Sequence, residues 1–210
     1  EILIGLVGSE MCIRDSYIPP GFPHDGFTHE TALNYSVGFR GPNGRDLISS
    51  FADYALENDL GGEHYSDPDL SCREHPGRVE QYELDRIRQM MFDMISKPDD
   101  FTKWFGSFVS TPRHELDIAA AEPPYAPEEV LDALQGGETL SRLSGLRVLN
   151  VNGSFFINSE QLETVDAKAA DALCRYTELG QAELGDALKN PAFVEELTVL
   201  INQGYWYFDE

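Results

Sequence analysis

The sequence predicts an α+β protein, and two observations carry this expectation. Residues 17–42 combine prolines with alternating apolar and polar positions, which is typical of short strands. Further along the chain, apolar residues recur every three or four positions in several segments, which indicates amphipathic helices. A hydrophobic fraction of 41% over 210 residues can supply the core of one large domain or of two small ones.

The chain is strongly acidic, with 15 Lys and Arg against 37 Asp and Glu and a net charge of -22. This charge opposes direct binding to a phosphate backbone. No window holds the roughly 18 uninterrupted apolar residues that a membrane span needs. Cys12, Cys72 and Cys174 are odd in number and lack Cys-x-x-Cys spacing, so neither a disulfide framework nor a zinc cluster is expected. We therefore expect no direct nucleic acid partner, no membrane attachment and a cytoplasmic setting.

The first sixteen residues look foreign to the rest of the chain. No basic region precedes their short apolar run, so they are not a convincing signal peptide. Codons that can encode residues 7–16 are similar to a common transposase-type sequencing adapter, and residues 1–6 can be encoded by its upstream extension. We interpret residues 1–16 as a non-native leader, with a native apolar strand over residues 2–7 as the alternative. On the first interpretation the chain is the C-terminal part of a longer protein.

Residues 17–42 predict two short strands around a turn. The prolines and the glycine of the string YIPPGFPHDG oppose a helix, whereas Tyr35, Val37 and Phe39 alternate with small or polar residues. His24 follows directly after this proline corner, which restricts the approach of its imidazole. Such restriction suits a metal ligand, although a histidine with a purely structural role fits the same position.

Residues 43–111 predict a unit of three helices. Asn43 can cap the first helix, which the pair Gly61-Gly62 ends. A second helical pattern opens at Pro76 and breaks before Pro98, where a third begins. Apolar stripes at helical spacing are more often core than a cofactor site. The stripes of the second and third helices are Val79, Leu84, Ile87, Met91, Met94 and Ile95, and Phe101, Trp104, Phe105 and Phe108.

Residues 112–127 are rich in proline and alanine, a composition that holds the backbone extended, and we expect a linker here. Beyond it, the pair Asn152-Gly153 is a strong signal for a two-residue hairpin turn. The order of the expected elements in residues 128–210 suggests a winged-helix-like module. These elements are a helix over 128–134, strands over 140–151 and 155–158, and helices over 167–176, 183–188 and 193–202.

A winged helix that reads DNA would need a basic recognition helix. The segment 166–176 holds only Lys168 and Arg175 against Asp166 and Asp171. Its local charge is therefore balanced within an acidic chain, and contact with a protein is the better role for this module.

Several strings of the chain together resemble one known family. They are YIPPGFPHDGFTHETALNYSVGFRGP, RDLISSFADY, GGEHYSDPD, WFGSFVSTPRHELDIAAAEPPY and the terminal GYWYF. Through them, residues 17–210 are similar to the bacterial JmjC ribosomal oxygenases, the ribosomal protein arginine 3-hydroxylases. The resemblance implies the end of a double-stranded β-helix of the cupin type over 17–42, a helical dimerisation region over 43–111 and a winged-helix domain over 128–210. For the implied homodimer we expect an interface through Leu47, Ile48 and Phe51.

The same resemblance implies Fe(II) and 2-oxoglutarate as cofactors. The implied substrate is a basic ribosomal protein of the large subunit, hydroxylated on an arginine. In the family a His-x-Asp pair on an early strand and a later histidine hold the iron, and such a facial triad leaves positions open for 2-oxoglutarate and dioxygen. His24 matches the later histidine, and Asn34 and Ser36 match positions near the cosubstrate.

The chain also departs from the family pattern. No His-x-Asp or His-x-Glu precedes His24, and Arg14 in the leader is the only basic residue before it. One imidazole cannot by itself hold catalytic ferrous iron. We therefore expect a 2-oxoglutarate-dependent dioxygenase by resemblance, with this chain inactive because two of the three iron ligands are missing. The alternative is an acidic dimeric protein-binding module without catalysis, for which His24 is irrelevant.

Overall fold

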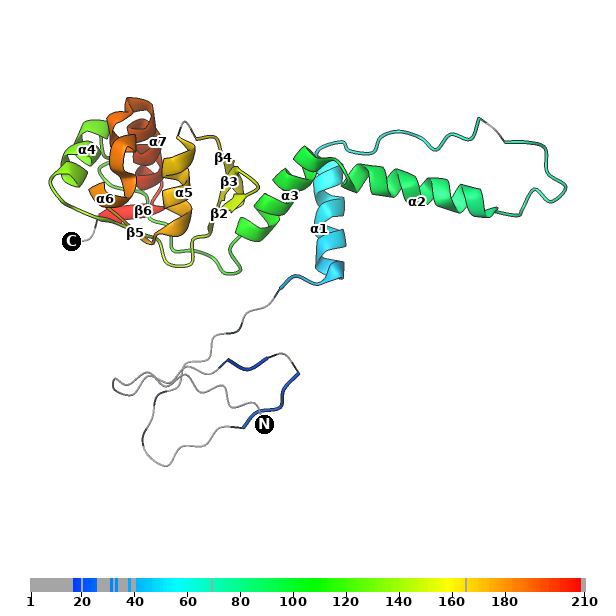
Figure 1. Cartoon of the computed structure of the whole chain (residues 1–210), viewed down its shortest axis with the longest axis horizontal. Coiled ribbons are helices and arrows are strands. Elements are labelled where there is room, and N and C mark those ends of the chain that lie inside the picture. The colour runs from blue at the N-terminus through cyan, green and yellow to red at the C-terminus, as the bar shows by residue number, and fades with distance from the viewer. Residues whose placement is uncertain are drawn as a thin grey trace. The chain divides into compact units, whose positions relative to one another are not determined.

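Figure 1 shows a computed structural model of the chain, which describes residues 17–19, 21–25, 31, 33, 38, 41–68, 70–164 and 166–208. The chain divides into two compact units, Glu1–Gly41 and Pro42–Glu210. The predicted leader lies outside the described residues, as do Tyr35, Val37 and Phe39. The two strands expected over residues 17–42 therefore stay a prediction, and the fold that follows is that of the second unit.

Helix α1 (Gly44–Glu57) begins where predicted, because Asn43 caps it. The Asn43 Oδ1 accepts the backbone N–H of Asp46 at 3.1 Å, and the Asp46 carboxylate accepts the backbone N–H of Asn43 at 3.4 Å. The helix ends before the glycine pair that we expected to stop it. At this end the carbonyl of Tyr54 accepts two hydrogen bonds from Asn58, one from its backbone N–H at 3.0 Å and one from its side chain at 2.9 Å.

Helix α2 (Gln81–Ile95) begins later than the expected start at Pro76. The Glu83 carboxylate accepts the backbone N–H of Glu80 at 2.8 Å and so fixes the first turn of the helix. The residues between Pro76 and Glu80 form a turn and an extended stretch instead. Proline suits a first helical position but does not require a helix to follow, so the local signal misplaced this boundary.

The expectation that the stripe of α2 lies in a core is wrong. No residue of α2 is buried. Leu84 is 50% exposed, Ile87 45% and Met91 58%, and of the stripe only Met94 packs against the buried cluster of the neighbouring helices. The spacing identified an apolar face, but nothing in the described part of this chain covers it.

Helix α3 (Pro98–Ser110) and α1 form a small aromatic core, which confirms the predicted stripe at Trp104 but not at Phe101, which is exposed. Trp104 is 5% exposed and meets the ring of Phe51 edge-on, with 5.1 Å between the ring centroids. The Trp104 Nε1 donates to the Ser50 Oγ at 3.0 Å, so the buried indole is satisfied. Ala55 completes the buried cluster.

The remaining elements form two small antiparallel sheets with helices packed around them (Figure 1). One sheet has the order β5-β1-β6 and the other, which is the wing, has the order β2-β3-β4. The elements run α4 (Pro127–Gln135), β1 (Leu140–Arg142), β2 (Val148–Val151), β3 (Ser154–Ile157), β4 (Glu160–Leu162), α5 (Ala167–Arg175), β5 (Glu178–Leu179), α6 (Gln181–Leu184), the 3-10 helix η1 (Gly185–Lys189), α7 (Pro191–Asn202) and β6 (Trp206–Phe208).

The hairpin predicted at Asn152-Gly153 is confirmed. Both residues have positive φ, 53° and 90°, as a two-residue turn between twisted strands requires, and Val151 pairs with Ser154 across it. The single strand expected over residues 140–151 is wrong. A turn at Gly145, with φ of 84°, splits it into β1 and β2, which belong to different sheets. Strands β4, β5 and β6 were not predicted.

The main core lies between α4, α7 and the β5-β1-β6 sheet. Leu134, Leu140, Phe193, Leu197 and Trp206 are each 0% exposed within it. Helix α7 contributes one broad face to this core, which explains its apolar sequence, whereas Val199 on the other side of the helix is exposed. In the described part of the chain, no helix is both long and apolar enough to cross a membrane.

The C-terminal half of α3 is joined to the wing through Gly106. An added Cβ at Gly106 would lie 2.2 Å from the ring of Phe156, which is 1% exposed, so only glycine allows this approach. Beside this contact, the buried Ser110 Oγ accepts the backbone N–H of Ser159 at 3.1 Å, and the Arg147 guanidinium donates to the carbonyl of Val109 at 3.0 Å. These contacts couple the helical unit to the wing.

We expect Gly106→Ala to lower the free energy of unfolding by about 1–3 kcal/mol, because the added methyl overpacks against Phe156. Urea unfolding of the full chain, followed by circular dichroism, measures this change. Gly44→Ala is the matched control, since a Cβ at Gly44 meets nothing within 4 Å. In a Phe156→Leu background Gly106→Ala should cost less. Equal effects of the two glycine changes would contradict the packing assigned to this joint.

Candidate functional site

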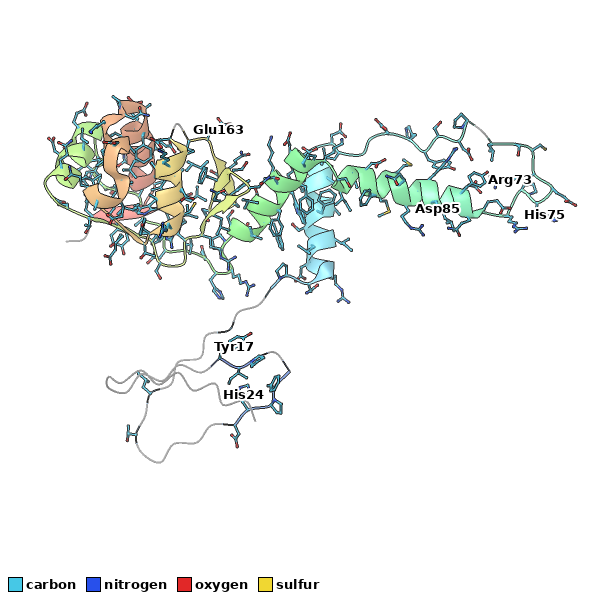
Figure 2. All side chains as sticks on the ribbon, in the orientation of Figure 1. Tyr17, His24, Arg73, His75, Asp85 and Glu163 are labelled. Atoms are coloured by element: carbon cyan, nitrogen blue, oxygen red, sulfur yellow. The ribbon has the colours of Figure 1, made fainter. Side chains whose placement is uncertain are left out.

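His24 follows the proline corner that the sequence predicted. The backbone N–H of Phe22 donates to the carbonyl of Pro19 at 3.3 Å, and Gly21 has φ of 81°, so the chain turns just before the histidine. The His24 side chain is exposed (Figure 2), and its Nδ1 lies 3.2 Å from the backbone carbonyl of Phe22. A donated hydrogen bond from Nδ1 leaves Nε2 as the nitrogen that can bind a metal.

The described residues do not assemble a metal site around His24. Within them, no group of three or more His, Cys, Asp and Glu side chains comes together in a way that could hold a metal ion. Asn34 and Ser36, the residues expected near the cosubstrate, lie outside the described residues. Their role stays a prediction.

The three residues expected at a dimer interface differ in their exposure. Phe51 is 7% exposed and Leu47 is half-buried, and both belong to the aromatic cluster with Trp104. Ile48 is 74% exposed. Of the three, Ile48 is therefore the exposed apolar side chain, and α2 carries more exposed apolar residues than α1. Of the exposed residues of α2, Leu84, Ile87, Met91 and Ile95 belong to the stripe that the sequence interpretation had placed in the core, and Met90 and Phe92 are exposed beside them.

The loop between α1 and α2 is fastened to the first turns of α2 by charged side chains. Arg73, labelled in Figure 2, donates to the Glu83 carboxylate at 2.6 Å, and Arg86 donates to Asp67 at 2.5 Å. The hydrogen bond from Arg73 holds the pKa of the Glu83 carboxyl below its usual range. Both guanidinium groups also lie about 6 Å from the ring of Tyr82, at 6.0 and 5.9 Å. The apolar stripe of α2 therefore belongs to an ordered surface.

Cys174 on α5 is not suited to nucleophilic chemistry. Burial raises the pKa of its thiol to about 11, with Asp171 adding to the shift. The thiol is therefore protonated at neutral pH, whereas a reactive cysteine needs its thiolate. The half-buried side chain instead packs against the main core.

The proline-rich segment 112–126 is pinned to the end of α7. The side chain of Asn202 accepts the backbone N–H of Tyr125 at 2.8 Å and donates to the Tyr125 carbonyl at 3.0 Å. The backbone N–H of Ala121 donates to the carbonyl of Asn202 at 3.1 Å. At Gly204 an added Cβ would lie 2.1 Å from the carbonyl oxygen of Ala119, so this glycine permits the close approach of the segment. We call residues 117–125 the strap.

A cavity of about 750 Å³ lies between the strap and β6. Its apolar wall includes Tyr125, Trp206 and Phe208, and the rings of Tyr125 and Phe208 meet edge-on at 5.6 Å. Its charged residues are carboxylates, Asp117, Glu122 and Glu129, and no Lys, Arg or His is among the described residues that line it. Sequence reasoning missed this site because it took the strap for a linker; the aromatic string GYWYF was the available signal.

Comparison with known families defines the class of this protein. A family model described as "ROXA-like winged helix" matches residues 89–207, and one described as "JmjC domain" matches residues 16–47. The first match spans more than half of the chain, so the chain belongs to the ROXA-like winged-helix family. The predicted winged-helix module is confirmed, and so is the resemblance to JmjC ribosomal oxygenases.

The chain is similar to two curated proteins. It is 52% identical over 193 residues to the ribosomal protein uL16 3-hydroxylase of Escherichia coli, which covers 92% of this chain and 52% of the relative. It is 25% identical over 181 residues to the probable ribosomal oxygenase of Haemophilus influenzae, with 77% of this chain and 42% of the relative covered. The chain thus spans about half the length of the curated relatives that it matches.

Solved structures agree with these relatives. The crystal structure of the Escherichia coli ribosomal oxygenase YcfD matches with a TM-score of 0.77 and 50% identity, over 82% of this chain and 48% of that one. A structure of YcfD in complex with cobalt and 2-oxoglutarate matches with a TM-score of 0.76 and 49% identity, over 83% of this chain and 48% of that one. YcfD itself therefore binds a metal and 2-oxoglutarate.

We expect Asn202→Ala to release the strap from α7, because it removes both side-chain hydrogen bonds to Tyr125. Each lost bond weakens the local structure by about 1 kcal/mol. Hydrogen exchange of the full chain should show faster exchange at the amide of Tyr125. Gln203→Ala is the control, since the Gln203 side chain is exposed and has no bond to the strap among the described residues. Unchanged exchange in Asn202→Ala would refute the anchoring role.

Proposed function

We propose that this chain is part of a protein hydroxylase that uses Fe(II) and 2-oxoglutarate and acts in the cytoplasm on an arginine of a large-subunit ribosomal protein. The observation that carries the proposal is the 52% identity to the Escherichia coli ribosomal protein uL16 3-hydroxylase over 92% of the chain. The cobalt and 2-oxoglutarate complex of YcfD supports the choice of cofactors. Residues 17–42 would form the end of the JmjC β-helix, and the match to a JmjC domain over residues 16–47 supports this.

The described residues do not by themselves fit an iron centre. A facial triad needs two imidazoles and one carboxylate, and His24 supplies one imidazole, with Nε2 free to bind. No described His, Asp or Glu joins it in a group of three ligands. No step of the reaction is therefore assigned to this chain, and we propose that it is inactive without the remaining ligands.

The proposed hydroxylase is a homodimer, and the exposed apolar face of α2 supports this part of the proposal. Ile87 and Met91 lie one helical turn apart on that face, and Ile95 continues it by another turn. Burial of an apolar side chain is worth about 1.5–3 kcal/mol, so several such residues give a second copy a favourable surface. The net charge of -22 also favours encounter with a basic ribosomal protein.

A second candidate function is an acidic dimeric protein-binding module without catalysis. The α2 face favours it as much as it favours the hydroxylase, because a dimer needs no metal. The two candidates differ in what they require of His24, which only the hydroxylase needs as a ligand.

The hydroxylase proposal is tested with a hybrid protein that supplies the part of the relative which this chain does not cover. Residues 17–210 joined to the portion of the Escherichia coli uL16 3-hydroxylase that this chain does not cover should add one oxygen atom to uL16, detected by mass spectrometry. His24→Ala should reduce that activity by about a hundredfold or more, because the iron loses a ligand. His64→Ala, at an exposed histidine of the α1–α2 loop, is the matched control. A folded hybrid without activity, or full activity of His24→Ala, would refute the proposal.

The proposed dimer is tested by a substitution that places a positive charge on the apolar face of α2. We expect the full chain to sediment as a dimer and Met91→Arg to convert it to a monomer, because an unpaired guanidinium inside an apolar interface costs several kcal/mol. Gln89→Arg adds the same charge to α2 and should leave the dimer intact, because among the described residues the Gln89 side chain donates only to the exposed Asp93 carboxylate, at 2.6 Å. A monomeric wild-type chain, or a dimer that survives Met91→Arg, would exclude this interface.

A further inference from the structure

We propose that the cavity between the strap and β6 binds an arginine side chain of a basic polypeptide segment. The cavity lies entirely within residues 117–208, so the inference requires neither iron nor His24 and stands apart from the hydroxylase proposal. Its volume of about 750 Å³ is within the range of ligand pockets.

The walls of the cavity are held in place before any ligand arrives. Asn202 fixes Tyr125 through two hydrogen bonds, and Gly204 lets the backbone of Ala119 approach closely. On the opposite wall, Tyr207 pairs with Ser141 in the sheet and is thereby fixed in β6. A pocket whose walls are already ordered spends little conformational entropy on binding.

The charges of the cavity select a cation. Asp117 and Glu122 are exposed and make no hydrogen bond or ion pair with any other described residue. Glu129 gives one oxygen to the backbone N–H of Ala126 at 2.8 Å, which leaves its other oxygen free of that bond. Because no described basic side chain lines the cavity beside them, these three carboxylates repel phosphate and attract a positively charged group. The charges of the cavity therefore disfavour a nucleic acid as its ligand.

The aromatic side chains select arginine among cations. Tyr125 is 38% exposed and Tyr207 is 45% exposed, so both present ring surface to a ligand in a cavity that they line. A guanidinium is planar and weakly hydrated, stacks on aromatic rings and pairs with carboxylates through two parallel hydrogen bonds. An ammonium group lacks the planar shape. The proline and aromatic side chains of the cavity can also pack against the residues of an extended peptide on either side of the arginine. A bare metal ion would make no such contacts.

Binding of a fluorescein-labelled peptide of alternating arginine and glycine to the full chain tests the inference, with fluorescence anisotropy as the readout at physiological salt. We expect this peptide to bind, its lysine counterpart to bind more weakly, and a glutamate counterpart and a single-stranded oligonucleotide not to bind. The double change Asp117→Asn with Glu122→Gln should weaken binding of the arginine peptide by about tenfold, since hydrogen bonds to charged groups are lost.

The matched control separates the cavity from the field of the whole chain. Glu160→Gln with Glu163→Gln removes the same charge at β4, which Glu160 begins and Glu163 follows (Figure 2 labels Glu163), and neither residue lines the cavity. This pair should change the affinity by less than about twofold. Tyr207→Ala should abolish the preference for arginine over lysine. Equal weakening by the two double changes, no binding of the arginine peptide, equal binding of the lysine peptide, or binding of the oligonucleotide would each overturn the inference.

Discussion

The contact between Gly106 and Phe156 is the constraint on which the second unit depends. The Phe156 ring occupies the space that a side chain at position 106 would need. The same helix carries Trp104, which closes the aromatic cluster with Phe51 on α1. Helix α3 therefore joins the aromatic cluster of the helices to the wing. Because Ser110 adds a buried hydrogen bond to the wing, a displacement of α3 would break both packing and polar contacts.

The helical unit does not complete its own core. Its buried cluster consists of Phe51, Ala55 and Trp104, and α2 adds no buried residue. A core of this size stabilises a unit by only a few kcal/mol, at about 1.5–3 kcal/mol for each fully buried large side chain. The unit therefore relies on the contacts of α3 with the wing. The loop salt bridges of Arg73 and Arg86 order the surface of α2 without burying its apolar stripe. This explains why the face stays available to a partner.

The sequence predicted best those features whose cause is local. Asn43 caps its own helix, and Asn152-Gly153 fixes its own turn, so neither needs distant residues. Periodicity revealed the apolar face of α2 but could not show what covers it. The other misses have distant causes: β6 pairs with β1 across the domain, and Asn202 anchors a strap some eighty residues earlier in the chain. Of the candidate sites, His24 was found from its proline corner, whereas the cavity depends on that distant pairing.

Charge acts in this protein over two ranges, and the two have different consequences. The net charge of -22 produces a long-range field that raises the rate of encounter with a basic protein, but salt screens it beyond about 8 Å at physiological ionic strength. Selection among basic partners must therefore come from groups in contact. Asp117 and Glu122 beside the rings of Tyr125 and Tyr207 are such groups. Since they sit on a strap held by Asn202, specificity in this winged helix depends on the anchoring of a segment without helix or strand.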